Sequence, residues 1–539
     1  MFRYPETGEF KDIKQKKIEI TDISVLEDNW RGDWMKANIQ EIVNVATSKS
    51  LTYQQKLYNL ANISERLISP IEVLGYTSEE MDYINNQMIC DLNEGYVLYR
   101  PRYIVPDYSV FINKGCEFLE LEPPKDLDEC LDGLLILYSH VPSITSFPVF
   151  IGHLDTLLEP FITDEQADYT KIKRFLNHID KTITDSFCHA DIGPYETKAG
   201  KLILEAVIEL ENPTPNMSMK YDKNKTSREF AKLAAKACLL VSKPSFSNDE
   251  TYSRDVGDHA LCSCYNALPF AGGAYTLSRL RLGTIVKSVD NLNQLIDELL
   301  PKVSRLMLSI MDKRNTYIVE KSNFFETNFL AKEGYINKDN FTSMFAIVGL
   351  ADCVNQLLQL EGINETFGKS LRGDEIGHLV MTTIQKEVEQ HKGKYVSRTN
   401  DKHLLHAQVG AKLHNEDDFN TPAHRVRVGE EPTLIDHLKH SAPFHQYFPS
   451  GTGDLFAFDQ TYVDHLDAVV DIIDGAFASG YRYITTYLKN TDLIRVTGYL
   501  VKKSEVEKAN NNNAVLRDTT WFGSGMDELN QVFDRSLRE

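Results

Sequence analysis

Apolar positions recur every three or four residues in several long stretches of this chain, which is the spacing of one face of a helix. LTYQQKLYNLANISERL, at residues 51–67, has this pattern and predicts a helix. TSREFAKLAAKACLL, at residues 226–240, predicts a second helix, with Thr226 or Ser227 as its N-cap and Cys238 on its buried face. A third helix is expected over residues 291–314, where Pro301 should kink it or begin a new one.

Short runs of β-branched and aromatic residues lie between these helices and predict strands. YVLYRPRYIVPDYSVF, at residues 96–111, is expected to be extended, and LIRVTGYLV, at residues 493–501, predicts a half-buried strand that contains a single glycine, Gly498. The asparagine run at residues 510–513 predicts an exposed turn after that strand. Alternating helices and strands indicate an α/β barrel or a layered α/β core, and the pattern alone does not choose between them.

Composition and charge indicate which kinds of molecule this protein is expected to bind. Apolar residues make up 42% of the 539 residues and charged residues 25%, the balance of a folded soluble protein. The formal net charge of -20 argues against nucleic acid and against an anionic membrane surface, because both attract basic patches. The first residues lack the apolar segment of a signal peptide, and no apolar run is long enough to span a bilayer. We therefore expect a cytoplasmic protein with a small-molecule or protein partner.

The eight cysteines are spread thinly, which predicts free thiols and no disulfide framework. No CxxC motif occurs, and no cysteine follows Cys353. This pattern excludes a cysteine-based zinc ribbon in the C-terminal third of the chain.

Gly498 interrupts an otherwise strand-like sequence and requires an explanation. One interpretation is a β-bulge, or a place where another backbone comes close. The other is chemical, because a radical on a glycine α-carbon is stabilised between a donating amide nitrogen and a withdrawing carbonyl. Without a Cβ such a centre can become planar, and the apolar neighbours could keep it dry.

The sequence around Gly498 resembles the C-terminal signature of the glycyl radical enzymes, an Arg-Val-x-Gly-Tyr followed by an aliphatic residue. The residues that match it are Arg495, Val496, Gly498, Tyr499 and Leu500. The position of the motif close to the end of the chain matches the family as well. The resemblance implies that Gly498 stores an organic radical.

A second segment resembles the cysteine loop of formate acetyltransferase and its relatives, in which a thiol passes the unpaired electron to the substrate. DHALCSCYNALPFAGGAYTLSRLRLG, at residues 258–283, matches that loop and the Ala-rich, Arg-containing helix expected after it. Upstream, Pro215, Asn216 and Met217 match the segment that precedes the loop. The resemblance places the thiyl radical on Cys264 and leaves Cys262 as a buried residue or a secondary thiol.

Differences from the family bear on the substrate. Formate acetyltransferase has two adjacent cysteines where this chain has Ser263 and Cys264, so pyruvate cleavage is not expected. The diol, glycerol and choline enzymes carry a glutamate base where this chain has Asn266, and an amide cannot take that proton. The four-cysteine zinc site of anaerobic ribonucleotide reductases is missing, as is an obvious nucleotide-sensing domain. The features are most similar to the YjjI-type branch.

The resemblance implies a fold and partners. The fold would be a ten-stranded α/β barrel, made of two five-stranded parallel half-barrels surrounded by helices, with the two loops meeting inside. Residues 1–475 would form the barrel core, with the cysteine loop near residues 258–283, and residues 476–539 the glycine radical region. A separate radical-SAM enzyme, with a 4Fe-4S cluster and S-adenosylmethionine, would install the radical. The chain itself would need no metal, would act on a small molecule, and could form a homodimer.

Other motifs give weaker predictions. SGTGD, from Ser450 to Asp454, is a candidate substrate loop because glycine-rich turns can present backbone amides to an anion. His437 and His440 could share one helix face, with His445 and Asp436 nearby, but such a pair indicates a metal site only with a third ligand in place. Cys188 and His189 are adjacent and suggest a nucleophile, although neighbours in a strand point in opposite directions. His153, with Asp155 nearby, is expected to be either a core histidine or part of a pocket wall.

Three functions remain in view. The first is an anaerobic radical enzyme in which Gly498 stores the radical and Cys264 takes hydrogen from a small polar substrate. The second is a protein without catalytic activity that uses the glycyl loop for partner binding or repair, although retention of Cys264 argues against it. The third is a metal-dependent hydrolase built on the histidines.

Overall fold

The computed structural model describes residues 39–65, 70–91, 99–141, 143, 147–408, 421–427, 429–488, 491–496 and 498–520. The chain divides into two compact units, residues 1–67 and 68–539. The first unit contains helix α3 (Tyr53–Glu65), as its apolar spacing predicts. No helix in the described part of the chain is both long and apolar enough to cross a bilayer. Everything below concerns the second unit.

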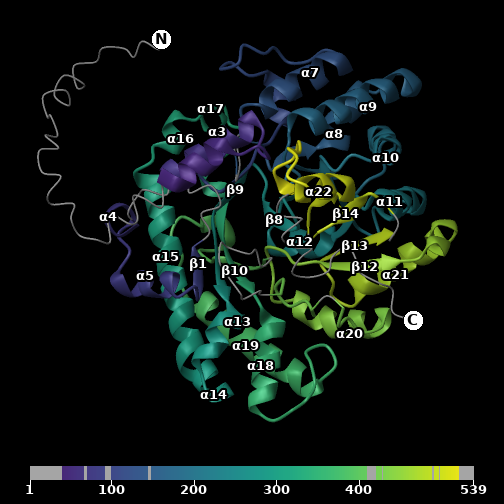
Figure 1. Ribbon diagram of the computed structural model, residues 1–539. Coiled ribbons are helices and arrows are strands. Elements are labelled where there is room, and N and C mark those ends of the chain that lie inside the picture. The colour runs from purple at the N-terminus through teal and green to yellow at the C-terminus, as the bar shows by residue number, and fades with distance from the viewer. Residues whose placement is uncertain are drawn as a thin grey trace, which may run out of the picture. The chain divides into compact units, whose positions relative to one another are not determined.

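Two β-sheets form the centre of the second unit (Figure 1). The five-stranded sheet has the order β1-β9-β10-β11, with β2 paired to β9. Its parallel strands are β9 (Gly272–Arg281), β10 (Phe341–Val348) and β11 (Leu404–Ala407), and β1 (Ile89–Asp91) and β2 (Tyr103–Val105) run antiparallel to β9.

The six-stranded sheet has the order β12-β13-β6-β5-β4-β3. Strands β3 to β6 are parallel to one another, as are β12 and β13, and the two groups meet antiparallel between β13 and β6. The strands are β3 (Phe150–His153), β4 (His189–Ile192), β5 (Asn216–Tyr221), β6 (Ser245–Asn248), β12 (Asp454–Phe458) and β13 (Tyr483–Leu488). Strand β13 lies between β12 and β6, so the C-terminal region expected at residues 476–539 contributes an inner strand to this sheet.

Helices cover both sheets. Helices α9, α10 and α11 lie side by side along the six-stranded sheet, and α15, α18 and α19 pack beside the five-stranded one (Figure 1). The helices of the second unit are α4 (Pro70–Leu74), α5 (Ser78–Asn85), α6 (Ser109–Lys114), α7 (Leu127–Tyr138), α8 (Leu154–Leu158), α9 (Glu165–Thr182), α10 (Lys198–Leu210), α11 (Arg228–Val241), α12 (Asp249–Asp255), α13 (Leu282–Ile285), α14 (Leu292–Gln294), α15 (Leu300–Glu320), α16 (Phe324–Thr327), α17 (Phe329–Lys332), α18 (Leu350–Leu360), α19 (Leu371–Gln390), α20 (Leu434–His445), α21 (Leu466–Ala478) and α22 (Lys503–Asn510).

The predicted helices are present, with boundaries set by caps. Helix α11 begins at the Ser227 cap, whose hydroxyl accepts the Phe230 amide, and Cys238 is fully buried on its inner face. Pro301 stands in the first turn of α15, directly after a π-helical turn at residues 295–299. The helix continues from the π turn into α15, since the Leu300 amide donates to the Leu295 carbonyl, and the wider π turn stands where Pro301 lacks an amide to donate.

One expected helix is a strand. The segment after the cysteine loop, Gly272–Arg281, forms β9, and every residue in it is buried. Two glycines at its start disfavour a helix, and β9 pairs with β1 and β2 on one side and with β10 on the other. Between Tyr103 and Phe111, β2 is extended as expected, whereas α6 begins at Ser109. The exposed asparagines at 511–513 follow helix α22, which separates them from the preceding strand.

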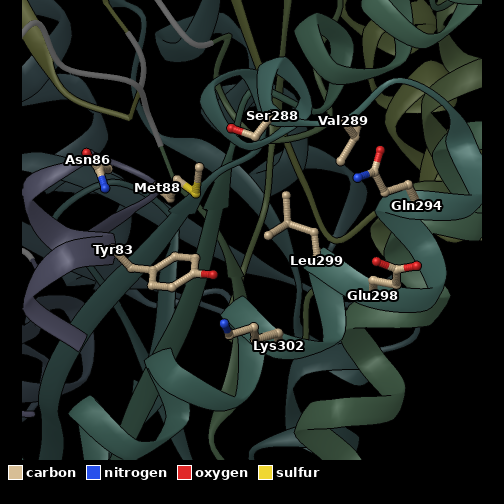
Figure 2. A pocket seen from close by; sticks show the side chains of 9 residues that line it. All are labelled: Tyr83, Asn86, Met88, Ser288, Val289, Gln294, Glu298, Leu299 and Lys302. Carbon is tan, nitrogen blue, oxygen red and sulfur yellow. The ribbon is translucent and has the colours of Figure 1, made fainter. Parts of the chain in front are cut away.

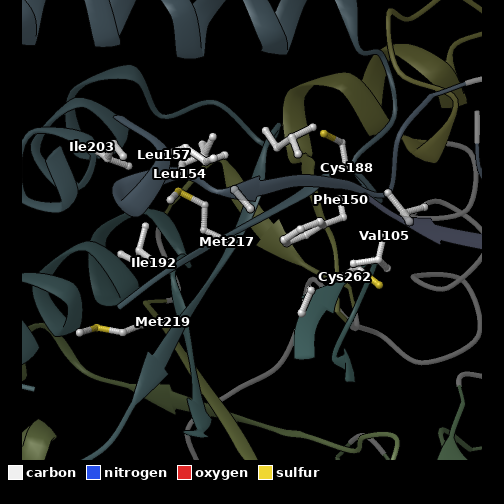
Figure 3. Packing of buried hydrophobic residues seen from close by; sticks show 14 of the residues in the cluster. Val105, Phe150, Leu154, Leu157, Cys188, Ile192, Ile203, Met217, Met219 and Cys262 are labelled. Atoms are coloured by element: carbon white, nitrogen blue, oxygen red, sulfur yellow. The ribbon is translucent and has the colours of Figure 1, made fainter. Parts of the chain in front are cut away.

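The core of this unit consists of two clusters of buried hydrophobic side chains. Figure 3 shows part of the first cluster, which includes Val105 of β2, Phe150 of β3 and Met217 of β5. Cys188 and Cys262 pack in this cluster as small apolar side chains. All eight cysteines are free, which confirms the prediction from their spacing.

Candidate active site

Gly498 lies in the turn of a small hairpin. The predicted continuous strand is instead two antiparallel strands, β14 (Leu493–Arg495) and β15 (Leu500–Lys502). The amide of Val496 donates to the Tyr499 carbonyl at 3.1 Å, which closes the turn around Gly498. The prediction of one strand was wrong because both arms of this buried hairpin are apolar. Two apolar arms that follow one another in the sequence have the same pattern as one longer strand.

Cys264 lies at the tip of a second hairpin, between β7 (His259–Cys262) and β8 (Asn266–Pro269). Residues 263–265 form its turn, and Ser263 adopts a left-handed backbone with a φ of 59°. Cys264 is 5% exposed, in the second hydrophobic cluster. The segment is therefore not extended at this point, and Cys262, in the first cluster, does not share the environment of Cys264. Its thiol donates to the Asn266 carbonyl at 3.7 Å.

The two turns touch, and Gly498 is the point of contact. A Cβ added to Gly498 would overlap the Cβ and Cα of Cys264 and lie 2.8 Å from its carbonyl carbon. The φ of Gly498 is not in the left-handed region, so its backbone conformation does not require glycine. Glycine is needed here because of the close approach. The α-hydrogen that a Cβ would replace points at Cys264.

A buried polar network holds Gly498 from the other side. The Asn216 side-chain amide donates to the Gly498 carbonyl, and the Asn216 carboxamide oxygen accepts the Arg495 guanidinium at 3.1 Å. The Arg495 Nε also donates to the Ser242 carbonyl at 3.1 Å. Burial lowers the pKa of Arg495 from its usual value, yet three hydrogen bonds to acceptors compensate the charge. The signature arginine thus positions the residue that contacts the glycine carbonyl.

Two side chains fix the backbone on either side of the cysteine turn. Tyr483 on β13 donates its hydroxyl to the Cys264 carbonyl at 3.2 Å. His189 on β4 lies with Nδ1 3.3 Å from the Ser263 carbonyl and Nε2 2.8 Å from the Ser218 hydroxyl. Burial lowers the pKa of His189 to about 3, so the ring is neutral at pH 7 and its Nδ1 carries the proton toward the carbonyl.

The predicted substrate loop, SGTGD, packs directly on the cysteine turn. The Ser450 carbonyl accepts the Ala267 amide at 2.8 Å, and the Ser450 hydroxyl donates to the Ala267 carbonyl at 3.4 Å. Gly451 has a φ of 124°, and a Cβ there would meet the Tyr265 carbonyl. The Ser263 hydroxyl lies 4.0 Å from the Cys264 thiol, Asn266 begins β8 opposite Cys262, and Ser450 reaches this hairpin at Ala267.

Asp454 lies at the end of the same loop, in a group with His424 and His445 that has the size of a metal site. His445 Nδ1 accepts the Arg482 amide at 3.1 Å, so the proton is on Nε2, which donates to Asp454 at 3.0 Å. A protonated nitrogen cannot bind a metal, which makes this group a hydrogen-bonded support for the loop. Of the three histidines singled out in the sequence, only His445 belongs to this group. His440 pairs with Asp374, and His437 packs on Phe456.

A second group suited to a metal consists of Asp312, His391 and His403. Asp312 lies 2.8 Å from His391 Nε2 and 3.0 Å from His403 Nε2. Both distances are those of hydrogen bonds from imidazole N–H groups to a carboxylate. Hydrogen bonds to the two imidazoles hold the pKa of Asp312 below its usual range despite partial burial.

The other candidates from the sequence are structural. Cys188 is buried, and desolvation raises the pKa of its thiol well above the usual value, so it is not an activated nucleophile. The partly exposed His153 lies 3.6 Å from the buried Asp191. Asp155 accepts the Gly193 amide at 2.8 Å, and burial raises its pKa to about 6.

A cavity of about 440 Å³ is lined by none of these residues (Figure 2). Lys302 lies above the Tyr83 ring, with Nζ 5.3 Å from the ring centre. The cavity has mixed polar and apolar walls, formed by Tyr83, Asn86, Met88, Ser288, Val289, Gln294, Glu298, Leu299 and Lys302.

Sequence reasoning missed several residues of the site. Tyr265 follows Cys264, and its ring lies 5.8 Å from that of His406 on β11. The Arg425 guanidinium lies 5.5 Å from the same Tyr265 ring. No local signal marks His406 or Arg425, since each is one polar residue in an ordinary segment. His189 was noticed only as a neighbour of Cys188.

Comparison with known proteins gives the context for this geometry. The family model for glycyl radical enzymes of the YjjI-like type matches residues 51–538. The chain is 68% identical to an uncharacterized protein of Haemophilus influenzae, over 94% of this chain and 98% of that one. It is 37% identical to the uncharacterized protein YjjI of Escherichia coli, over 93% of this chain and 96% of that one.

Solved structures of glycyl radical enzymes share the fold. The anaerobic ribonucleotide reductase of Thermotoga maritima, in complex with dATP and CTP, superposes with a TM-score of 0.69 at 12% identity, over 95% of this chain and 99% of that one. The B12-independent glycerol dehydratase of Clostridium butyricum has a TM-score of 0.63 at 12% identity, over 87% and 86%. These matches confirm the expected barrel fold, whose strands within the described residues fall into sheets of five and six. With the family model covering nine tenths of its length, the chain belongs to the YjjI-like glycyl radical enzyme family.

Proposed function

We propose that this protein is an anaerobic radical enzyme in which Gly498 stores the radical and Cys264 carries it to a small polar substrate. The observation that supports the proposal most directly is the contact between the two turns, in which an α-hydrogen of Gly498 points at Cys264. Hydrogen transfer requires the reacting atoms to approach within roughly 3 to 3.5 Å, and only a glycine permits such an approach here.

In the proposed reaction cycle, each hydrogen atom taken from one group is passed to another. A radical-SAM activating enzyme removes one α-hydrogen from Gly498, which becomes part of 5′-deoxyadenosine. The Gly498 radical then takes the hydrogen of the Cys264 thiol, which restores glycine and leaves a thiyl radical. The thiyl takes a hydrogen from a substrate C–H bond, and the product radical later takes it back. Each turnover therefore returns Cys264 to the thiyl state, ready to recover its hydrogen from Gly498.

The surroundings suit both radicals. The Asn216 amide that donates to the Gly498 carbonyl strengthens its electron-withdrawing character, which favours a radical on the neighbouring α-carbon. The flanking Val496, Tyr499 and Leu500 are buried, so the centre is kept from water. The carbonyls of Ser263 and Cys264 are both held by hydrogen bonds, which keeps the thiol in place during repeated transfer.

Electron paramagnetic resonance tests the proposal without knowledge of the substrate. Anaerobic incubation with the radical-SAM activase and S-adenosylmethionine should give a doublet from the single remaining α-hydrogen, which is missing in Gly498→Ala. In D2O the Cys264 thiol exchanges its hydrogen for deuterium and delivers it to Gly498, so the doublet should collapse to a single line. Cys264→Ser should keep the radical and the doublet.

Two outcomes would contradict the proposal. No radical with an activase shown to bind the chain would favour the alternative of a glycyl-loop protein that acts by partner binding or repair. A doublet that collapses equally fast in Cys264→Ser would remove Cys264 from the transfer path.

A further inference from the structure

Tyr265, which follows Cys264, and the two side chains next to its ring, His406 and Arg425, each have one buried polar atom without a hydrogen-bond partner in the described part of the chain. Tyr265, His406 and Arg425 are 1%, 0% and 9% exposed. Within the described residues, Tyr265 Oη, His406 Nε2 and Arg425 Nη2 have no hydrogen-bond partner. Each such buried group costs roughly 1 to 3 kcal/mol, and native proteins leave few of them. Three in one place, next to the residue proposed to react, indicate that a ligand completes them.

Arg425 and Tyr265 both offer hydrogen-bond donors. The Arg425 Nε is already used, because it donates to the Gly453 carbonyl at 2.7 Å, and this bond fixes the side chain with Nη2 unused. Burial raises the pKa of Tyr265 well above its usual value, so its hydroxyl keeps the proton at neutral pH. A planar guanidinium and a phenol suit the oxygens of a carboxylate. Asp454 Oδ1 lies 3.8 Å from Arg425 Nε and has no hydrogen-bond partner among the described residues, while its Oδ2 accepts hydrogen bonds from Ser441 and His445.

His406, by contrast, offers a hydrogen-bond acceptor, its Nε2, which is unpartnered within the residues that the structure describes. Its Nδ1 lies 3.2 Å from the Ser450 carbonyl, and because a carbonyl oxygen only accepts, the ring proton must be on Nδ1. Burial, with a smaller contribution from the positive charge of Arg102, lowers the pKa of His406 to about 3, so Nε2 keeps its lone pair at neutral pH. Such an atom requires a donor from the ligand, and a hydroxyl group is the simplest.

We propose that the substrate is a small hydroxy carboxylate, whose carboxylate is bound by Arg425 and Tyr265 and whose hydroxyl donates to His406. This inference rests on the proposed function, since it places a C–H bond of the ligand beside Cys264. A phosphate ester fits less well, because Arg425 is the one cation among these three groups, whereas phosphate dianions draw several cations or a helix N-terminus.

Binding to the purified, unactivated full chain tests the inference by isothermal titration calorimetry. The probes are glycerate, glycerol, which lacks the carboxylate, and propionate, which lacks the hydroxyls. Glycerate should bind at least about tenfold more tightly than either, since each of the lost contacts involves a desolvated polar group. Arg425→Gln should reduce glycerate affinity to that of glycerol, and His406→Phe should reduce it to that of propionate while leaving propionate unchanged.

Matched controls keep the result interpretable. Arg427→Gln removes a half-exposed guanidinium two residues away, which pairs with Asp352, and should leave glycerate binding unchanged. If Arg425→Gln does not fold, Arg425→Lys keeps the charge without the planar fork and should lose part of the affinity. Circular dichroism of each variant verifies the fold.

Several results would overturn the assignment. They are equal binding of glycerol and glycerate, an unchanged affinity in Arg425→Gln, and no binding of glycerate at all. All of these measurements are made without a radical, so a failure leaves the radical test on Gly498 untouched. Conversely, a missing radical signal together with tight glycerate binding would reject the radical function and keep the site.

Discussion

Substitution of Gly498 by alanine should destabilise the protein because of a steric overlap, independently of any radical chemistry. The added Cβ would lie 2.8 Å from the Cys264 carbonyl carbon and would overlap the Cα and Cβ of the same residue. Carbon atoms in contact are normally about 3.5 to 4.0 Å apart, and the Cα and Cβ of Cys264 would be nearer than the carbonyl carbon, so the two turns would have to separate by more than about 1 Å.

The magnitude follows from which atoms must move. Overpacking in a well-packed core typically costs about 1 to 3 kcal/mol. Two of the atoms met at Cys264 belong to the backbone, and its turn is held by Tyr483 and His189, so we expect the upper half of that range. Such a separation would slow hydrogen transfer by at least about a hundredfold even if a radical could form, because a displacement of about 1 Å already costs that much in positioning.

Urea unfolding of the unactivated protein, followed by circular dichroism, measures the effect. Gly475→Ala is the matched control: the residue lies in the exposed face of α21, and an added Cβ meets nothing within 4 Å. There alanine should stabilise the protein by up to about 1 kcal/mol, because glycine is a poor helix residue. A Gly498→Ala protein as stable as the wild type would refute the contact between Gly498 and Cys264 on which this reasoning depends.

Three further predictions concern the supports of the site and its response to pH. Asn216→Leu removes the donor to the Gly498 carbonyl, which is worth about 1 kcal/mol, and should shorten the anaerobic lifetime of the radical signal several-fold; an unchanged decay would show that this bond does not stabilise the radical. Tyr483→Phe releases the Cys264 carbonyl and should slow the collapse of the doublet in D2O about five- to tenfold, with no effect on the yield of radical, whereas an unchanged rate would make Tyr483 a residue of fold alone. Burial lowers the pKa of both His189 and His406 to about 3, from about 6.5 in the unfolded chain, so the stability they contribute is complete above pH 6.5 and is lost as the pH falls toward 3. Each should cost roughly 2 kcal/mol between pH 6.5 and 5, seen as a lower urea midpoint at pH 5, and His406→Phe should reduce that loss.

The sequence alone indicated the residues proposed for hydrogen transfer, because their chemistry depends on residue type at positions close together in the chain. The Arg-Val-x-Gly-Tyr signature and the cysteine segment each fit within a few residues, and the family match confirms the family they indicated. Helices α11 and α15 were predictable for a related reason, since helical periodicity is a local property. Caps and proline positions, which are also local, gave their boundaries.

Predictions of secondary structure from the sequence were wrong where residues distant in the chain determine the backbone conformation. Residues 272–281 contain alanine, leucine and arginine and were expected to be a helix, but pairing with strands on both sides makes them β9. The apolar run around Gly498 was expected to be one strand and is two short arms of a hairpin. In both cases the hydrogen bonds that determine the backbone come from distant segments, which a local pattern does not contain.

Only the tertiary structure brings together the groups proposed to bind the substrate. Tyr265, His406 and Arg425 come from three distant segments and meet because β11 and the Ser450–Asp454 loop pack on the cysteine turn. One buried polar atom of each has no hydrogen-bond partner among the described residues, which only the packed structure reveals. The sequence alone therefore determined which chemistry the chain is equipped for, through residue types at short spacing. Packing between distant segments decided where that chemistry is held and what it can bind.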